Sequence, residues 1–266
     1  MNEKKVAVVT GGTSGIGRAT ALALKDAGCT VYELSRRAEG VEGLHHISAD
    51  VTDESAVNAA VAQVVAAEGQ IDILVNNAGF GISGAIEFTS TTDAKSLFDV
   101  NFFGMVNMNR AVVPLMRAAG HGRIVNLSSV AAPVPIPFQA YYSATKAAVN
   151  AYTMALANEL RPFGVMVCAV MPGDIHTGFT AARRKLSEGD DIYQGRISRS
   201  VVRMEHDEQT GMDPAKAGAY IAKVALRSGS NHPLYAIRFD YKFFAFLAKV
   251  LPARFLNWLI YLLYGK

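Results

Sequence analysis

Residues 141–150, YYSATKAAVN, place two tyrosines just before a lysine. Tyr142 and Lys146 are four residues apart, so on an α-helix their side chains share one face, whereas Tyr141 at that spacing meets only Thr145. A nearby ammonium group favours the phenolate and makes a tyrosine usable as an acid and a base near neutral pH. The spacing therefore indicates Tyr142 as a candidate acid/base group, provided that motifs elsewhere in the chain support it.

A glycine-rich turn lies near the N-terminus, in VAVVTGGTSGIGRATAL at residues 6–22. Gly11, Gly15 and Gly17 let the backbone bend tightly and approach a pyrophosphate, whose charge is favoured by the free amides at a helix N-terminus. An ordinary tight turn is the alternative. The strand-like run before the turn and the helix-forming run after it favour a dinucleotide site.

The next strand-like run ends in LSRR, residues 34–37. A chain that binds NAD typically has an acidic residue here for the ribose hydroxyls, and a chain that binds NADP has an arginine nearby. Here the acidic position holds Ser35, and Arg36 and Arg37 follow with guanidinium groups that suit a 2′-phosphate. Two solvated surface arginines are the alternative, and the pattern favours NADP(H).

Short apolar runs rich in β-branched residues alternate along the chain with longer helix-forming stretches. Continuous apolar strands that alternate with helices are typical of a parallel sheet covered on both faces. We therefore expect an α/β fold with a Rossmann-like, doubly wound parallel sheet. The expected strands are residues 6–10, 30–34, 44–48, 71–75, 122–127, 165–170 and 234–239, and the expected helices include 15–28, 54–69 and the stretch after Ser143.

Length and composition narrow the class of protein. A chain of 266 residues of which 50% are hydrophobic buries a sizeable core, and we expect a single domain. The net charge of +3 is spread out, which argues against nucleic-acid binding. Cys29, Cys168 and the scattered histidines predict no disulfide and no metal site. The apolar run Val6–Val9 is too short for a signal peptide, so a cytoplasmic protein is expected.

Two segments depart from the alternating pattern. Residues 178–212 are polar, contain glycine and have mixed charge, which predicts a lid with its basic side chains on a solvated face. Residues 241–266 form an apolar helical extension beyond the catalytic domain, residues 1–240, and Pro252 divides it into two pieces. The extension is too short for a bilayer span of ~20 residues. The substrate cleft, a second subunit and a membrane surface contacted through Lys249, Arg254 and Lys266 are its alternative covers.

Four motifs together resemble the short-chain dehydrogenase/reductase family. They are TGGTSGIG at 10–17, NNAG at 76–79, YSATK at 142–146 and PGDIHT at 172–177, in the order and at the spacings of that family. The resemblance implies a seven-stranded sheet in the order 3-2-1-4-5-6-7 with the cofactor at the carboxyl ends of the strands. In character the chain is closest to the hydroxysteroid and retinol dehydrogenase-like branch, which has similar C-terminal tails.

The resemblance also implies an active-site tetrad. Its members are Asn101, Ser129, Tyr142 and Lys146, with Ser129 rather than Ser128 at the thirteen-residue separation from the tyrosine. Tyr142 gives a proton to the carbonyl oxygen, and Ser129 gives that oxygen a hydrogen bond. Lys146, aided by the positive nicotinamide ring of the oxidised cofactor, lowers the pKa of Tyr142 from about 10 towards about 7, and it holds the nicotinamide ribose. Asn101 continues a proton path through water.

The cofactor site implied by the resemblance is spread along the chain. Asp50 and Val51 contact adenine, residues 77–79 line the ribose side, and Ile175 and Thr177 hold the carboxamide. The full expected set is Gly11, Ser14, Gly15, Ile16, Gly17, Ser35, Arg36, Arg37, Asp50, Val51, Asn77, Ala78, Gly79, Tyr142, Lys146, Pro172, Gly173, Ile175 and Thr177.

The motifs together predict an NADP(H)-dependent oxidoreductase that interconverts a secondary alcohol and a ketone. The loop at residues 130–141 has no charged residue and offers no ionic anchor, which favours a neutral, lipophilic substrate. A hydroxysteroid is the most concrete candidate, with a 3-oxoacyl reductase or a non-catalytic NADP(H)-binding regulator as alternatives. We further expect a homodimer or homotetramer, no nucleic-acid partner, and the membrane surface as one option for the extension.

Overall fold

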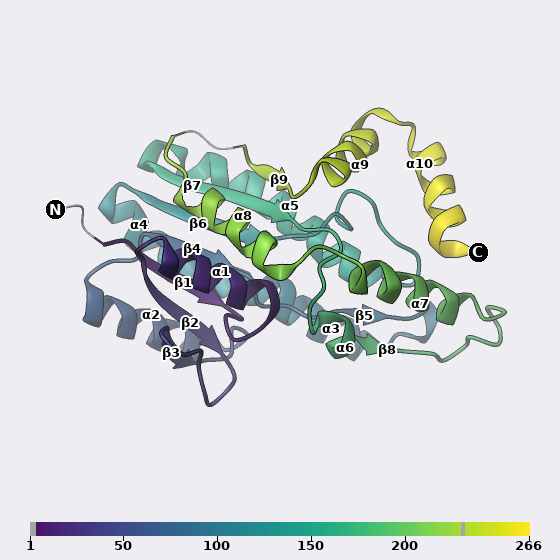
Figure 1. The fold of residues 1–266 in the computed structure, drawn as a ribbon, viewed down its shortest axis with the longest axis horizontal. Coiled ribbons are helices and arrows are strands. Elements are labelled where there is room, and N and C mark those ends of the chain that lie inside the picture. Colours follow the sequence, from purple (N-terminus) through teal and green to yellow (C-terminus); the bar gives the residue numbers. More distant parts are fainter. Residues whose placement is uncertain (1–3, 230–231) are drawn as a thin grey trace.

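A seven-stranded parallel sheet forms the centre of the molecule (Figure 1). The computed structural model describes residues 4–229 and 232–266. The strands of the sheet are β1 (Val6–Thr10), β2 (Thr30–Ser35), β3 (His45–Ser48), β4 (Ile73–Asn76), β6 (Gly122–Leu127), β7 (Val165–Met171) and β9 (Leu234–Ala236). Their spatial order is β3-β2-β1-β4-β6-β7-β9, so the order expected from the resemblance is confirmed. All neighbouring pairs in this sheet are parallel.

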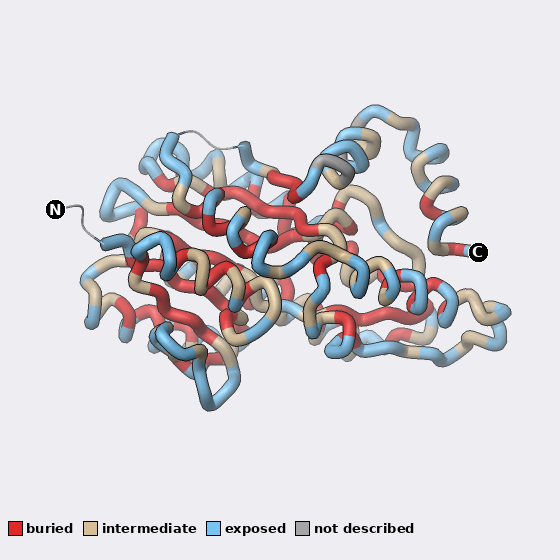
Figure 2. The backbone as a smooth tube through the Cα atoms, in the orientation of Figure 1, coloured by how far each residue is buried: buried red, intermediate tan, exposed pale blue. Residues whose placement is uncertain are grey.

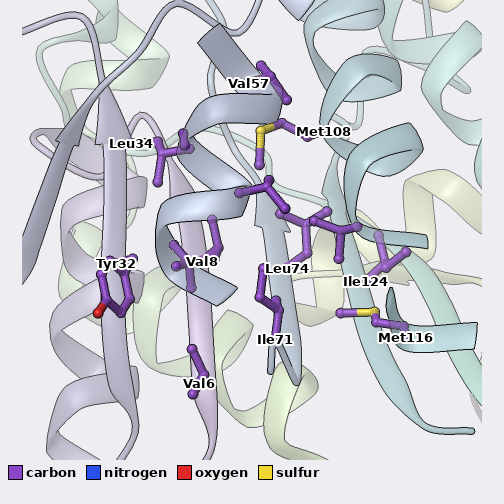
Figure 3. Close-up of a cluster of buried hydrophobic side chains, with 14 of the residues drawn as sticks. Val6, Val8, Tyr32, Leu34, Val57, Ile71, Leu74, Met108, Met116 and Ile124 are labelled. Atoms are coloured by element: carbon purple, nitrogen blue, oxygen red, sulfur yellow. The ribbon is translucent and has the colours of Figure 1, made fainter. Parts of the chain in front are cut away.

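Helices cover both faces of the sheet, and each face has its own core. On one face lie α1 (Gly15–Asp26) and α8 (Pro214–Leu226), and on the other lie α2 (Glu54–Glu68), α4 (Gly104–Ala119) and α5 (Ala140–Leu160). Figure 3 shows the second of these cores, where Val8 of β1 and Leu74 of β4 meet Met108 of α4. Because both faces of the sheet are buried, its central strands are mostly apolar, and every residue of β1 is buried (Figure 2).

Local sequence signals set the bounds of several helices. Asp53 caps α2 by accepting hydrogen bonds from the amides of Ser55 and Ala56. Asp213 caps α8 in the same way, and Pro214 occupies the first turn, where no amide donor is needed. Gly69 ends α2 in the left-handed conformation, with a φ of 78°.

Beyond the carboxyl ends of the strands, a smaller layer closes over the sheet edge (Figure 1). It contains β5 (Ile82–Ser83), a 3-10 turn (Ile86–Phe88), α3 (Thr91–Phe98), α6 (Phe179–Ala182), β8 (Arg184–Lys185) and α7 (Arg196–Gln209). β5 and β8 form a separate two-stranded parallel sheet, which the sequence analysis missed because two-residue strands leave no periodic pattern. The polar excursion at 178–212 is therefore largely structured.

The C-terminal segment comprises α9 (Phe239–Val250), α10 (Ala253–Ile260) and a final π-helical turn (Tyr261–Gly265). The strand expected at 234–239 ends at Ala236, because α9 already begins at Phe239. Pro252 separates the two helices, as expected from its lack of an amide donor. Within residues 4–229 and 232–266, every helix is too short or too polar to cross a bilayer.

Candidate active site

Tyr142 and Lys146 lie in the first two turns of α5, which starts where the loop after β6 meets the sheet edge. Both side chains line one cavity of about 370 Å³, whereas Tyr141 does not line it. The Lys146 ammonium nitrogen lies 5.7 Å from the centre of the Tyr142 ring. The helical spacing of four residues thus brings these two side chains together as the sequence predicted.

Lys146 is a buried cation held by the backbone. Its side chain is only 5% exposed, and its ammonium donates a hydrogen bond of 2.8 Å to the carbonyl oxygen of Leu127, at the end of β6. Burial removes water from the charged form and lowers the pKa of Lys146 to about 8. The lysine is therefore positioned by the sheet rather than by solvent.

Burial dominates the pKa of Tyr142. It raises this pKa to about 12 in the protein alone, whereas the expected value near 7 includes the positive charge of a bound nicotinamide ring and stays a prediction. A hydrogen bond with Ser129 and the charge of Arg183 act in the opposite direction and do not offset the loss of water. Tyr142 is thus a neutral phenol at physiological pH, which is the form that donates a proton.

The two serines after β6 have different surroundings. Ser128 is buried, and its hydroxyl donates to the Lys146 carbonyl at 3.0 Å, so it supports α5 from behind. Ser129 lines the cavity, accepts a hydrogen bond of 3.1 Å from the Ala131 amide and interacts with Tyr142. Of the two hydroxyls, that of Ser129 is placed to meet a substrate.

Asn101 lies one layer behind the cavity, in the π-helical turn Asp99–Phe103 between α3 and α4. Its amide group donates to the Phe80 carbonyl and accepts from the Phe80 amide, both at 3.0 Å. A Cβ on Gly79, which lines the cavity, would come within 2.9 Å of the Asn101 oxygen. Asn101 thus lies directly behind the cavity wall. The wider turn fixes its orientation, although a water path from it remains a prediction.

The glycine-rich turn leaves room for a dinucleotide. Gly11 and Gly15 adopt positive φ values of 65° and 52°, which glycine adopts without strain. A Cβ on Gly17 would lie 2.3 Å from the Gly11 carbonyl oxygen, so α1 packs on the turn only without a side chain there. The expected cofactor residues that line the cavity are Gly11, Ser14, Gly15, Ile16, Arg37, Asn77, Ala78, Gly79, Tyr142, Lys146, Pro172, Gly173, Ile175 and Thr177.

The expected adenine end lies outside this cavity. Ser35 ends β2 and Arg36 follows it, whereas Asp50 and the buried Val51 follow β3; Arg36 lies 3.8 Å from the Asp50 carboxylate. Glu33, the acidic residue of β2, is fully buried and paired with His46, whose other ring nitrogen lies 3.0 Å from the Arg37 carbonyl. The Glu33 carboxylate is therefore engaged by His46, which also contacts the loop that carries the arginines.

The cavity has walls that the sequence analysis did not predict. Its far side is formed by Phe179 and Ala182 of α6, Met204 and Glu208 of α7, and Tyr264 near the C-terminus. Asp174, after β7, also lines it, and burial raises the pKa of this carboxyl group. The loop at 130–141 carries no charge, as expected, but Asp174 brings a carboxyl group to the cavity from a different segment.

The lid contains a buried polar link. Arg183 is fully buried and pairs with Glu208, which also accepts a hydrogen bond of 2.6 Å from Thr180. The guanidinium carbon of Arg183 lies 5.6 Å from the centre of the Phe179 ring. The expected solvated face of basic residues therefore excludes Arg183. No sequence signal marks it, because its partner lies 25 residues along the chain.

With this geometry established, comparisons with known proteins identify similar chains. The family model described as short chain dehydrogenase matches residues 5–188. A 3-ketodihydrosphingosine reductase of Bacteroides thetaiotaomicron is 40% identical over 228 residues, which are 85% of each chain. A solved short-chain dehydrogenase from Streptomyces avermitilis is 34% identical, with a TM-score of 0.85 over 97% of each chain.

Solved structures of the same fold hold either form of the nicotinamide coenzyme. ElxO, 28% identical with a TM-score of 0.75, holds NADP. A 3-ketoacyl-(acyl-carrier-protein) reductase from Brucella melitensis, 27% identical with a TM-score of 0.71, holds NADH. The fold and the glycine cradle thus fit a nicotinamide dinucleotide without deciding between the two forms.

The buried lysine makes stability depend on pH in a definite direction. Since the pKa of Lys146 is about 8 in the folded protein and 10.5 when unperturbed, the unfolded chain binds more protons between these values. The destabilisation is fully present below pH 8 and declines as the pH rises towards 10.5. The free energy of unfolding of the wild type should therefore gain about 2 kcal/mol relative to Lys146→Met between pH 7 and about 9.5.

Urea unfolding of both proteins at the two pH values measures this gain. Lys216→Met, which removes a lysine from the exposed surface, is the matched control. If the difference between wild type and Lys146→Met stays constant with pH, Lys146 is not a desolvated ammonium.

Proposed function

The chain belongs to the short-chain dehydrogenase/reductase family, and from this premise we propose that it reduces a ketone in a long-chain lipid with NADPH. The substrate class that we propose is a 3-keto sphingoid base, a long alkyl chain with an amino group next to the ketone. The observation that carries the proposal is the convergence of Tyr142, Ser129 and Lys146 on one cavity that the carboxylate of Asp174 also lines.

The proposed reaction uses each side chain in one role. The bound coenzyme supplies the hydride that the carbonyl carbon receives. Tyr142 donates its phenolic proton to the carbonyl oxygen, and Ser129 donates a hydrogen bond to the same oxygen. The ammonium of Lys146 stabilises the phenolate left on Tyr142 until a proton returns from solvent.

The protonation state of Tyr142 supports the reductive direction. With a pKa raised to about 12, Tyr142 carries its proton at neutral pH and is ready to donate it. Oxidation of an alcohol needs the phenolate as a base, and burial disfavours that form. We therefore propose that Tyr142 rests in the protonation state that ketone reduction requires.

The cavity lining supports an amphiphilic substrate. Val130, Ile136, Phe179 and Met204 offer apolar surface, and Asp174 after β7 supplies a carboxylate, whereas Glu208 is already paired with Arg183. A protonated amine next to the ketone suits the Asp174 carboxylate, and an alkyl chain suits the apolar wall. The similarity to a protein named 3-ketodihydrosphingosine reductase supports the same choice.

Two other substrate classes compete. A hydroxysteroid, the candidate favoured by the sequence, suits the apolar wall around Ile136 but brings no amine to the Asp174 carboxylate. A 3-oxoacyl thioester suits the wall equally well and also lacks the amine. A non-catalytic regulator is disfavoured, because it needs no tyrosine and lysine converging on the cavity.

A substrate panel tests the proposed class. NADPH oxidation is followed with 3-ketodihydrosphingosine, its analogue without the amino group, a 3-ketosteroid and a 3-oxoacyl thioester. We expect the highest kcat/KM for the amino ketone, and a loss of about tenfold or more without the amine, as for a lost hydrogen bond to a charged group. Equal kcat/KM with and without the amine, or faster turnover of the steroid, would contradict the proposed substrate.

Variants of the two neighbouring tyrosines test the proton donor. Tyr142→Phe should lower kcat by ~100-fold or more, because the carbonyl oxygen loses its general acid. Tyr141→Phe, the matched control, should keep wild-type kcat, since Tyr141 does not line the cavity. NADPH binding, measured by fluorescence, should persist in both variants. A Tyr142→Phe enzyme with full turnover would refute the assigned role.

We also propose NADPH rather than NADH as the coenzyme, because two arginines follow β2 and its carboxylate is buried against His46. The double variant Arg36→Asp, Arg37→Asp should lower the ratio of kcat/KM for NADPH over NADH by about 10-fold or more through lost charge-assisted hydrogen bonds. Arg117→Asp, an exposed change on α4, controls for the loss of surface charge. An unchanged ratio in the double variant would exclude a 2′-phosphate site here.

A further inference from the structure

A large part of the exposed apolar surface belongs to the C-terminal segment. On α9, α10 and the final turn, the large apolar side chains that are 44–57% exposed are Phe243, Phe244, Phe246, Val250, Phe255, Trp258, Tyr261 and Leu263. We call this surface the tail face. Figure 2 shows the segment as mostly exposed or intermediate, in contrast to the buried strands. This many exposed apolar side chains on one short segment indicate an interaction site.

The tail face belongs to a segment that is fastened at both ends. At its start, the Tyr241 hydroxyl donates to the Asp174 carboxylate at 2.7 Å, and its ring packs where a Cβ on Gly173 would lie. At its end, the Tyr264 hydroxyl bonds with Asp207 of α7 at 3.0 Å. Between these points α9 and α10 project from the body (Figure 1). The exposure is therefore a property of a docked segment.

The charge of the segment points to an anionic partner. Residues 239–266 contain four lysines and arginines and one acidic residue, Asp240. Lys242, Arg254 and Lys266 are exposed around the tail face. If a second copy covered this face about a two-fold axis, each cation would approach the same set of cations on the other subunit. An anionic surface avoids that repulsion.

The side-chain types of the tail face suit the interface of a bilayer. Interfacial helices combine Trp, Phe and Leu on one face with Lys and Arg beside it. Trp258 and Phe255 stack with ring centres 5.9 Å apart, and both are about half exposed. Rings of this kind settle at the boundary between headgroups and acyl chains, while neighbouring cations meet the phosphates.

We propose that α9 and α10 dock this protein on the surface of a bilayer that contains anionic phospholipids. The segment lies in the headgroup region without crossing the membrane, with the tail face turned towards the acyl chains. The bilayer, rather than a second subunit or the substrate cleft, then covers the apolar surface that the sequence analysis left open.

The docked position brings the membrane close to the cavity. Tyr264 lines the cavity, and Tyr241 packs against Gly173 and Asp174, which also line it. A lipid substrate leaving the bilayer beside this segment reaches the pocket without crossing bulk water. This link to substrate delivery rests on the proposed function, whereas bilayer docking does not depend on it.

Vesicle sedimentation of the full-length protein, without substrate, tests the docking. One set of vesicles is pure phosphatidylcholine, and the other contains about one third phosphatidylglycerol. The protein should prefer the anionic vesicles, and Arg254→Gln should weaken that binding about fivefold, as expected near ~1 kcal/mol for one basic residue. The double variant Phe255→Ser, Trp258→Ser should weaken it by about tenfold or more through lost apolar burial.

Phe163→Ser serves as the matched control. Phe163 is 45% exposed but lies in the turn between α5 and β7, outside the tail segment, so its substitution should leave vesicle binding unchanged. Turnover of a water-soluble, short-chain ketone without vesicles should be the same in the double variant and the wild type. A loss there would show damage to the enzyme, and no turnover in either protein would count against the proposed function alone.

Two outcomes would overturn the proposal. The first is equal sedimentation of the wild type and the double variant with anionic vesicles. The second is a combination of two results: the wild type does not bind vesicles, and the double variant has a lower molecular mass than the wild type in analytical ultracentrifugation. That combination would assign the tail face to a second copy.

Discussion

The site depends on one buried charge, the ammonium group of Lys146, and on the backbone carbonyl that receives it. Its hydrogen bond to the Leu127 carbonyl joins α5 to the end of β6. The bond therefore fixes the position of α5, which carries the proposed proton donor Tyr142, relative to the sheet. Ser128 strengthens the same junction by donating to the Lys146 carbonyl. An ammonium with little water around it destabilises the folded protein, and the surrounding packing has to offset that cost. The buried lysine is therefore explained by the chemistry proposed for it and not by a contribution to stability.

Much of the fold follows from the sequence, because its signals are local. Seven apolar runs become the seven strands of the sheet, and Gly11 and Gly15 form the turn that their flexibility suggests. Tyr142 and Lys146 share a helix face because a spacing of four residues has one geometric meaning on a helix. The candidate tetrad is found from sequence because its two central members are neighbours on one element.

The lid side of the cavity could not be found in that way. Glu208, Met204 and Tyr264 reach Tyr142 from more than sixty residues away in the chain, and no local period records such a contact. The burial of Tyr142 was unpredictable for a related reason. Sequence shows that a lysine is close, but only the structure shows that water is excluded from both groups, and this exclusion is the largest cause of the raised pKa of Tyr142.

The small sheet of β5 and β8 gives the lid a mechanical role. Ile82 and Ser83 pair with Arg184 and Lys185, so the segment before α7 is hydrogen-bonded to the chain just after Phe80. Phe80 in turn exchanges two hydrogen bonds with Asn101. Displacement of residues 184–185 would therefore break their pairing with β5, close to the residue that holds the Asn101 amide. The two-stranded sheet thus ties the lid to the turn that orients Asn101.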